Sequence, residues 1–207
     1  MSGLMSAFYR ISEWIMRFAY LNILWIFFTL TGLIVLGIFP ATVAIFAVNR
    51  KWVMGETDIP VFETFWSTYK TEFLKSNLLG LTLIAIGCIL YMDYRIIMDS
   101  ASEIGKIFFI PLLVFIFLYS LLLLYVFPLF TNYDIKIFQV IKTSLIMMVL
   151  YPLSTIMMVI SCVIVYYVMN LVPGLILFFG LSSLSFLLTW CAHYAFAKNQ
   201  KKEALPE

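Results

Sequence analysis

The pattern of apolar and charged positions divides the chain into four long uncharged stretches, residues 18–49, 76–92, 107–133 and 143–197. Every Asp, Glu, Lys and Arg lies in the segments between or beyond them. A bilayer imposes such segregation, because a charge at its centre costs several kcal/mol. A crossing helix needs about 20 mostly apolar residues. The pattern therefore predicts an all-α, polytopic membrane helix bundle.

Five crossings account for these stretches, within one transmembrane domain over residues 18–198. The predicted spans are residues 18–48, 77–98, 107–127, 143–169 and 175–197. The first contains a helix break at Gly37, Phe39 and Pro40, because proline cannot donate a hydrogen bond to the preceding turn. The apolar run after Pro40 is too short for a second complete crossing. We therefore interpret residues 18–48 as one long, broken helix, with a re-entrant segment as the alternative.

Three segments outside the spans carry polar residues. Residues 1–17 are expected to form an N-terminal interfacial helix, and residues 199–207 a polar tail. Residues 60–76 are expected to form an amphipathic helix, because aromatic side chains recur there at helical spacing. The aromatic residues are Phe62, Phe65, Trp66, Tyr69 and Phe73. This stripe either lies flat in the headgroup layer or binds a partner at the cytoplasmic face.

The distribution of basic residues indicates the orientation. Five crossings place the two termini on opposite faces of the membrane. One face would carry Arg10, Arg17, Arg95 and Lys106. The other would carry Arg50, Lys51, Lys70, Lys75, Lys136, Lys142, Lys198, Lys201 and Lys202. Because Lys and Arg are enriched on the cytoplasmic side, we expect the N-terminus outside and the C-terminus inside a plasma membrane.

Composition narrows the chemistry further. The chain is 64% hydrophobic and 12% charged, with a mean hydropathy of +1.04, and its net charge of +2 does not indicate nucleic-acid binding. Cys88, Cys162 and Cys191 all lie in apolar stretches, which favours buried hydrophobes over a disulfide or a metal site. No phosphate-binding Walker loop occurs, so the chain is not expected to energise transport from ATP itself.

No arrangement of catalytic groups is apparent in the sequence. We therefore expect no catalytic, cofactor-binding or metal-binding residue, and no enzymatic activity. Hydroxyl and amide side chains within the spans are interpreted as hydrogen-bonding groups between helices, with a solute path as the alternative. They are Asn22, Thr29 and Thr31 in the first span and Ser182, Ser183 and Ser185 in the fifth.

Several short motifs resemble those of the YesL family of small bacterial membrane proteins. They are Leu21-Asn22-Ile23-Leu24-Trp25, Phe39-Pro40-Ala41-Thr42 with the following Arg50-Lys51, Phe65-Trp66-Ser67-Thr68-Tyr69-Lys70, and Phe73-Leu74-Lys75-Ser76-Asn77. The clearest similarity covers residues 18–80. Members of this family tend to be encoded beside sugar ABC-transporter permeases, solute-binding proteins, two-component regulators and enzymes that cut plant polysaccharides.

The resemblance implies a role in carbohydrate uptake. The leading hypothesis is a non-enzymatic accessory subunit of an oligosaccharide ABC importer, bound to its permease and ATPase. The alternatives are a stand-alone carrier or channel, or a membrane partner of a sensor kinase. A homo-oligomer is compatible with each hypothesis.

Overall fold

The computed structural model describes the backbone of residues 2–99 and 103–203, and the side chains of residues 5–99 and 107–197. Over this part of the chain the fold is all-α, without a strand. The helices are α1 (Ser2–Thr31), α2 (Ile38–Val53), α3 (Val61–Thr71), α4 (Phe73–Asp99), α5 (Glu103–Asn132), α6 (Ile137–Leu150), α7 (Pro152–Leu171) and α8 (Gly174–Glu203).

Five helices are long and apolar enough to cross a membrane, which confirms the polytopic helical class. These segments are Met5–Thr31, Phe73–Asp99, Ile107–Asn132, Pro152–Leu171 and Gly174–Ala197. The helices α2 and α6 are also apolar but shorter, with 16 and 14 residues. Their short length separates them from the candidate crossings.

Both ends of the described chain are more helical than the sequence suggests. The expected interfacial helix over residues 1–17 is not separate, because α1 continues through residue 17 into the first apolar stretch. No glycine or proline lies between Gly3 and Gly32 to interrupt it. At the other end, α8 continues to Glu203, into the expected polar tail. Residues 1 and 204–207 of these two segments lie outside the described residues.

The apolar stretch over residues 18–48 folds into an antiparallel hairpin of α1 and α2. Near the turn, Trp25 Nε1 donates to Thr42 Oγ1 at 3.1 Å. Farther from it, the rings of Trp14 and Trp52 lie 5.6 Å apart in an edge-to-face contact. The prediction of one broken crossing is therefore wrong, because α2 runs back along α1 instead of extending it.

The turn of this hairpin, residues 32–37, is tight because two glycines meet across it. A Cβ atom on Gly32 would lie only 2.4 Å from the Cα of Gly37, so no larger residue fits without a shift of the backbone. Between them, Leu33 and Ile34 have φ angles of 59° and 62°. These left-handed conformations cannot continue a right-handed helix. The chain therefore reverses within six residues.

The helix α3 runs back along the hairpin toward the same turn. At its start, Lys51 Nζ lies 3.5 Å from Thr64 Oγ1. At its end, Tyr69 Oη donates to the carbonyl of Phe28 at 3.2 Å. The chain thus leaves the turn along α2 and returns along α3, so the pair adds no net crossing between α1 and α4.

The amphipathic helix expected over residues 60–76 ends earlier, at Thr71. Glu72 has φ −96° and ψ 6°, and the next helix, α4, begins at Phe73. Asn77 in the first turns of α4 donates to the carbonyl of Leu36 at 3.0 Å. The second crossing therefore starts beside the hairpin turn, four residues before its predicted position.

The third crossing is longer than predicted. It continues to Asn132, although Pro128 lies inside the helix and removes one of its hydrogen bonds. Packing against α2 offsets this loss: the rings of Phe46 and Phe127 stack at 5.6 Å. A tertiary contact thus overrides the local signal that placed the end of this span at residue 127.

The fourth predicted span, residues 143–169, consists of two helices, α6 and α7. Pro152 is the first residue of α7, and Tyr151 before it has a non-helical φ of −123° and ψ of 64°. Because Pro152 has no N–H, the carbonyl of Met148 loses its helical donor. The hydroxyl of Thr155 lies 3.1 Å from this carbonyl oxygen and replaces that donor. The expected continuous crossing is therefore wrong.

The central helix of the molecule is α2, which contacts α1, α3, α4, α5 and α8. Small side chains allow these neighbours to approach: Ala41 and Ala44 are fully buried, as are Ile45 and Val48. On the α4 side, Gly80 accepts the ring of Phe39, which would lie 2.3 Å from an added Cβ. Burial on all sides explains why a 16-residue helix can be apolar without crossing a membrane.

Two buried asparagines tie α1 and α2 to α8. Asn22 Nδ2 donates to the carbonyl of Leu177 at 2.7 Å, and its Oδ1 accepts from the N–H groups of Leu181 and Ser182, both at 3.1 Å. Asn49 Nδ2 donates to Ser185 Oγ at 2.7 Å. The predicted role of Asn22 and Ser185 as hydrogen-bonding groups between helices is confirmed.

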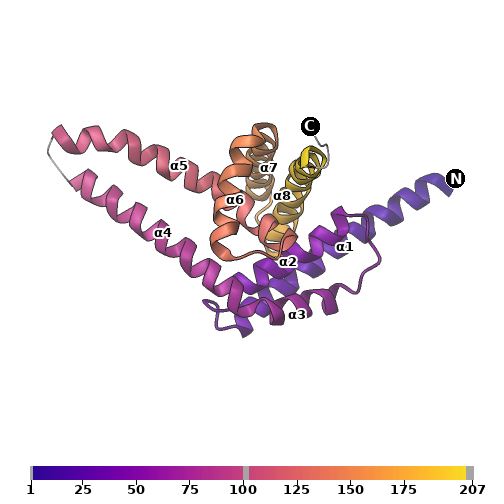
Figure 1. The fold of residues 1–207 in the computed structure, drawn as a ribbon. Helices are drawn as coiled ribbons and strands as arrows, with labels where there is room; N and C mark the ends of the chain where they lie inside the picture. The colour runs from indigo at the N-terminus through magenta and orange to yellow at the C-terminus, as the bar shows by residue number, and fades with distance from the viewer. Residues whose placement is uncertain (1, 100–102, 204–207) are drawn as a thin grey trace.

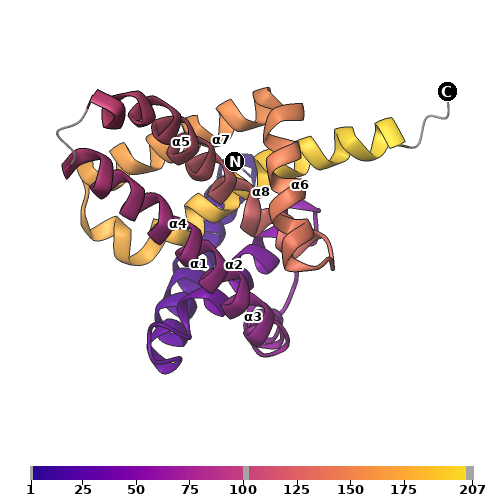
Figure 2. The ribbon, with the colours of Figure 1, turned by 60° about the vertical axis from the view of Figure 1, so that its left-hand side comes forward.

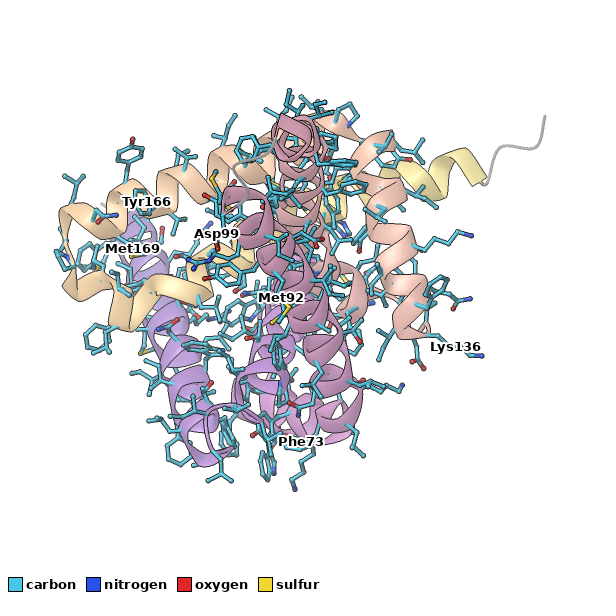
Figure 3. All side chains as sticks on the ribbon, turned by 90° about the vertical axis from the view of Figure 1, so that its left-hand side faces the viewer. Phe73, Met92, Asp99, Lys136, Tyr166 and Met169 are labelled. Atoms are coloured by element: carbon cyan, nitrogen blue, oxygen red, sulfur yellow. The ribbon has the colours of Figure 1, made fainter. Side chains whose placement is uncertain are left out.

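The helices α4 and α5 form an arm that extends away from the rest of the molecule (Figure 1). Seen from another side, α7 and α8 run side by side across the back of the molecule, while α3 lies below α2 (Figure 2). Figure 3 looks along the arm, with Met92 and Asp99 on α4 and with Phe73 and Lys136 toward its base. Side chains along the arm are mostly apolar and exposed, as a lipid-facing surface requires.

Candidate functional site

The aromatic side of α3 packs on α1 of the same chain. The ring of Phe28 lies 5.3 Å from that of Phe65, 5.1 Å from that of Trp66 and 5.1 Å from that of Tyr69. Phe65 is fully buried, and burial raises the pKa of the Tyr69 phenol above its usual value. This stripe therefore holds α3 against the α1–α2 hairpin.

This packing changes the interpretation of the five residues expected to bind a partner. Phe65 and Tyr69 are inside the chain's own core and offer no surface to another protein. Phe73 belongs to α4, where its ring contacts Tyr69 edge-to-face at 5.7 Å. Phe62 is 47% exposed, and Trp66 is partly exposed with Lys70 Nζ 4.1 Å from its ring centre. Of the stripe, Phe62 and Trp66 reach the surface of α3.

The residues expected to break the first helix lie at the start of α2. Gly37 is the N-cap of α2, and Phe39 and Pro40 occupy its first turn. Pro40 costs no hydrogen bond there, because the first N–H groups of a helix have no acceptor within it. The chain reverses just before this position, in the turn described above.

A polar groove lies on the opposite side of α3 from the aromatic stripe. Its volume is about 420 Å³, and it is lined by α2, α3, the start of α4, the end of α5 and the segment that follows α5. Its polar lining consists of Arg50, Lys51, Thr64, Ser67, Thr68, Thr71, Glu72, Lys75, Thr131, Asn132, Tyr133 and Asp134. A volume of about 300–1,000 Å³ is typical of small-molecule sites.

Two neighbouring cations in the groove have no carboxylate partner. Arg50 Nη1 donates to the carbonyl of Thr131 at 2.9 Å, and Lys51 Nζ lies 3.5 Å from the hydroxyl oxygen of Thr64. Within the described part of the chain neither forms an ion pair. The Nε of Arg50 is buried and has no acceptor among the described groups. Both cations lie in the last turn of α2, where the negative end of the helix dipole stabilises positive charge.

The rest of the lining supplies one ion pair and a row of hydroxyls. Lys75 Nζ and Asp134 Oδ1 are 3.0 Å apart, so this acid and base largely neutralise each other. The hydroxyls of Thr68 and Thr71 donate to the carbonyls of Thr64 and Ser67 in their own helix, at 2.9 and 3.0 Å. Their oxygens therefore remain available as acceptors. The groove can bind a ligand that combines negative charge with hydrogen-bond donors.

Candidate metal ligands do not gather anywhere in the described residues, where no group of three His, Cys, Asp or Glu could hold an ion. The three cysteines are free, and only Cys191 is buried. Cys88 is exposed on the arm, contrary to the expectation that all three are buried.

Comparison with known proteins places the chain in a family. Residues 18–94 match the family described as "Protein of unknown function, DUF624". The uncharacterized protein YteU of Bacillus subtilis (strain 168) is 44% identical over 89% of this chain and 82% of its own length. The chain belongs to the DUF624 family.

Two further uncharacterized proteins of the same strain are similar to this chain. YesL is 38% identical over 92% of this chain and 90% of its own length, and YesV is 37% identical over 94% and 93%. The resemblance to the YesL family noted in the sequence is thereby confirmed. No solved structure matches the chain.

The DUF624 match ends before α5, so it covers the hairpin, α3 and most of α4. The matched segment includes most of the polar groove lining, namely Arg50, Lys51, the hydroxyl row of α3 and Lys75. It does not include the groove wall around Asp134. The sequence did not predict this groove, because its lining combines α3 with residues 130–135, which are distant in the sequence. The available signal was the spacing of Thr64, Thr68 and Thr71, which places three hydroxyls on one side of a helix.

Proposed function

We propose that the chain is a non-enzymatic accessory subunit of a bacterial carbohydrate uptake system of the ABC type. It would reside in the plasma membrane and bind the permease and ATPase of an oligosaccharide importer. The observation that carries the proposal is the outer face of α3, defined here by five exposed or partly exposed residues. They are Phe62, Glu63, Trp66, Ser67 and Lys70.

This outer face suits protein association better than membrane anchoring. The aromatic rings that would anchor α3 in lipid are mostly turned inward onto Phe28, while charged and hydroxyl groups point outward. A surface helix held firmly by its own core presents such groups in a fixed geometry, which lowers the entropic cost of binding. The resemblance to the YesL family supports the carbohydrate part of the proposal.

Co-purification tests the proposal directly. Tagged protein is crosslinked in membranes, solubilised in mild detergent and captured, and the bound proteins are identified. We expect a sugar permease and its ATPase, and we expect a severalfold loss with Phe62→Ala or Trp66→Ala because interface aromatics often dominate binding energy. The matched control is Phe138→Ala, which removes an exposed ring on α6. Absence of any permease or ATPase after crosslinking would refute the accessory role.

A stand-alone carrier or channel gives a different result in a second experiment. Liposomes containing this protein alone would then show solute flux, whereas an accessory subunit gives none without its permease. A sensor kinase captured in place of the permease would favour the third hypothesis.

The proposed orientation, N-terminus outside and C-terminus cytoplasmic, is tested separately. Single cysteines at Ser2 and Glu207, in a variant lacking Cys88, Cys162 and Cys191, are exposed to an impermeant thiol reagent in intact cells. Because α2 and α3 add no net crossing, we expect label at residue 2 only. Equal labelling of both positions would require an even number of crossings.

A further inference from the structure

We infer that the polar groove between α2, α3 and the α5–α6 segment binds a phosphate group that carries a hydroxylated substituent. The inference goes beyond the proposed function and does not depend on it. It rests on the unpaired cations of the groove, on its hydroxyl row and on its position relative to the apolar stretches.

The charges of the groove favour a single negative charge. Lys75 and Asp134 form a pair, so Glu72 remains as the opposing charge to Arg50 and Lys51. An arginine side chain presents a planar set of donors that matches the oxygens of phosphate, and a neighbouring ammonium adds a point charge.

The hydroxyl row explains why a bare anion does not satisfy the whole groove. Thr68 and Thr71 direct their hydrogens to helix carbonyls, so they accept rather than donate toward a ligand. Acceptors repel phosphate oxygens but bind the hydroxyl hydrogens of a polyol. A phosphodiester of glycerol, with one negative charge and free hydroxyls, matches both halves of the lining.

The position of the groove points to the membrane surface. Arg50 directly follows the uncharged stretch of residues 18–49, Lys75 directly precedes that of residues 76–92, and Asp134 directly follows that of residues 107–133. Three apolar stretches therefore end at one groove, and their charged ends lie together there. Lipid phosphates occupy this boundary between hydrocarbon and water.

Two sources can supply this chemistry, an anionic phospholipid headgroup or a soluble phosphorylated polyol. The full chain, purified in a non-ionic detergent, is titrated with short-chain phosphatidylglycerol, short-chain phosphatidylcholine, glycerol 3-phosphate and inorganic phosphate. Binding is followed by the change in tryptophan fluorescence and by the shift in melting temperature. Saturable binding of phosphatidylglycerol alone identifies the headgroup, and binding of glycerol 3-phosphate as well identifies the free phosphate ester as sufficient.

Variants assign the binding to the groove. We expect Lys51→Gln and Arg50→Gln each to raise the dissociation constant about tenfold, as the loss of a charge-assisted hydrogen bond does. Lys142→Gln removes an exposed lysine on α6 outside the lining and should leave it unchanged. Because Arg50 also bonds to Thr131, Lys51→Gln provides the decisive test if Arg50→Gln lowers the melting temperature without ligand. Failure of all four ligands to bind, or equal weakening by Lys142→Gln, would overturn the inference.

Discussion

Helix α2 of the central hairpin and helix α5 of the arm are both apolar but have opposite surroundings. In α2, most residues are buried against five other helices. In the apolar segment of α5, only 11% of the most hydrophobic window is buried. Hydrophobicity alone therefore does not distinguish a residue that packs inside the protein from one that faces lipid, because both environments exclude water.

Small and polar residues instead distinguish the packed helices from the lipid-facing ones. The packed region contains glycine contacts and buried amides that bond to neighbouring helices, as at Gly37, Asn22 and Asn49. On the arm, the hydroxyl of Ser120 bonds to the carbonyl of Ile116 in its own helix, while the hydroxyl of Tyr119 on α5 donates to the carbonyl of Leu83 on α4 at 2.8 Å. In membrane proteins, close backbone approach and hydrogen bonds between helices drive packing more than burial of apolar area. Four pairs of substitutions test this contrast.

The largest difference is expected for two phenylalanines. Phe65 is fully buried between α3 and α1, whereas Phe117 on the arm is 62% exposed. Phe65→Ala should lower the free energy of unfolding by about 3–5 kcal/mol, because it leaves a cavity. Phe117→Ala should change it little, since this ring meets detergent in the folded and unfolded states alike. Unfolding in mixed micelles with increasing sodium dodecyl sulfate measures both, and equal losses would remove the contrast.

The next difference concerns glycines. A Cβ at Gly37 would lie 2.5 Å from the carbonyl oxygen of Thr29, whereas at Gly87 on the arm its neighbours would be side-chain atoms of Tyr119, with the hydroxyl nearest at 3.2 Å. Gly37→Ala should cost about 1–3 kcal/mol, because backbone atoms must shift, and Gly87→Ala should cost less. The same unfolding assay applies, with Gly174→Ala as the control, since nothing lies within 4 Å of that position. A stable Gly37→Ala variant would contradict the tight turn.

The hairpin and the fourth span show where sequence reasoning succeeds and where it fails. The uncharged stretches correctly indicate a helical membrane protein with five long apolar helices, because the exclusion of charge is a property of each segment by itself. The path of residues 18–48 depends instead on which surfaces meet in space. The local signal for the reversal was the pair Gly32 and Gly37, and the signal for the break before α7 was Pro152. Averaging hydropathy over a stretch of sequence does not detect either signal.

The site was only partly predictable for a similar reason. The spacing of the aromatic residues correctly identified α3 as an amphipathic helix but not what its apolar side contacts. The apolar side of α3 packs on Phe28, which lies more than 30 residues before α3 in the sequence. Phe28 is one of many apolar residues in its stretch, so the sequence does not mark it as a contact. The groove also requires the segment around Asp134. In the sequence, the two long helices α4 and α5 lie between α3 and this segment.

A smaller effect is expected from the polar contacts. Asn22→Leu removes three hydrogen bonds to α8 and should cost about 1–2 kcal/mol, since such bonds in membrane proteins contribute modestly. Ser120→Ala on the arm should have no measurable effect, because its hydroxyl only supplements a helical carbonyl. The midpoint of thermal unfolding in detergent reports both. A loss with Ser120→Ala as large as with Asn22→Leu would show that a hydroxyl bonded within its own helix matters as much as an amide bonded between helices.

The smallest effect is expected where the arm meets the rest of the chain. The ion pair of Lys75 and Asp134 is exposed, and exposed pairs contribute little because water screens them. Lys75→Gln and Asp134→Asn should leave the melting temperature unchanged, singly and together. A double-mutant cycle measures the coupling between them, and a clear coupling that persists in high salt would indicate that the base of the arm is fixed electrostatically.

The hydrogen bonds from Asn22 and Asn49 to α8 have a consequence for biosynthesis. Their acceptors and donors lie more than 130 residues later in the chain, so both amides are synthesised long before their partners. Until α8 is made, the amide of Asn22 lacks its partner within the first apolar helix, where an unsatisfied polar group is costly. A product terminated before residue 177 can never satisfy them, and we expect cellular proteases to remove it. Completion of α8 is therefore the step at which both amides first find their partners.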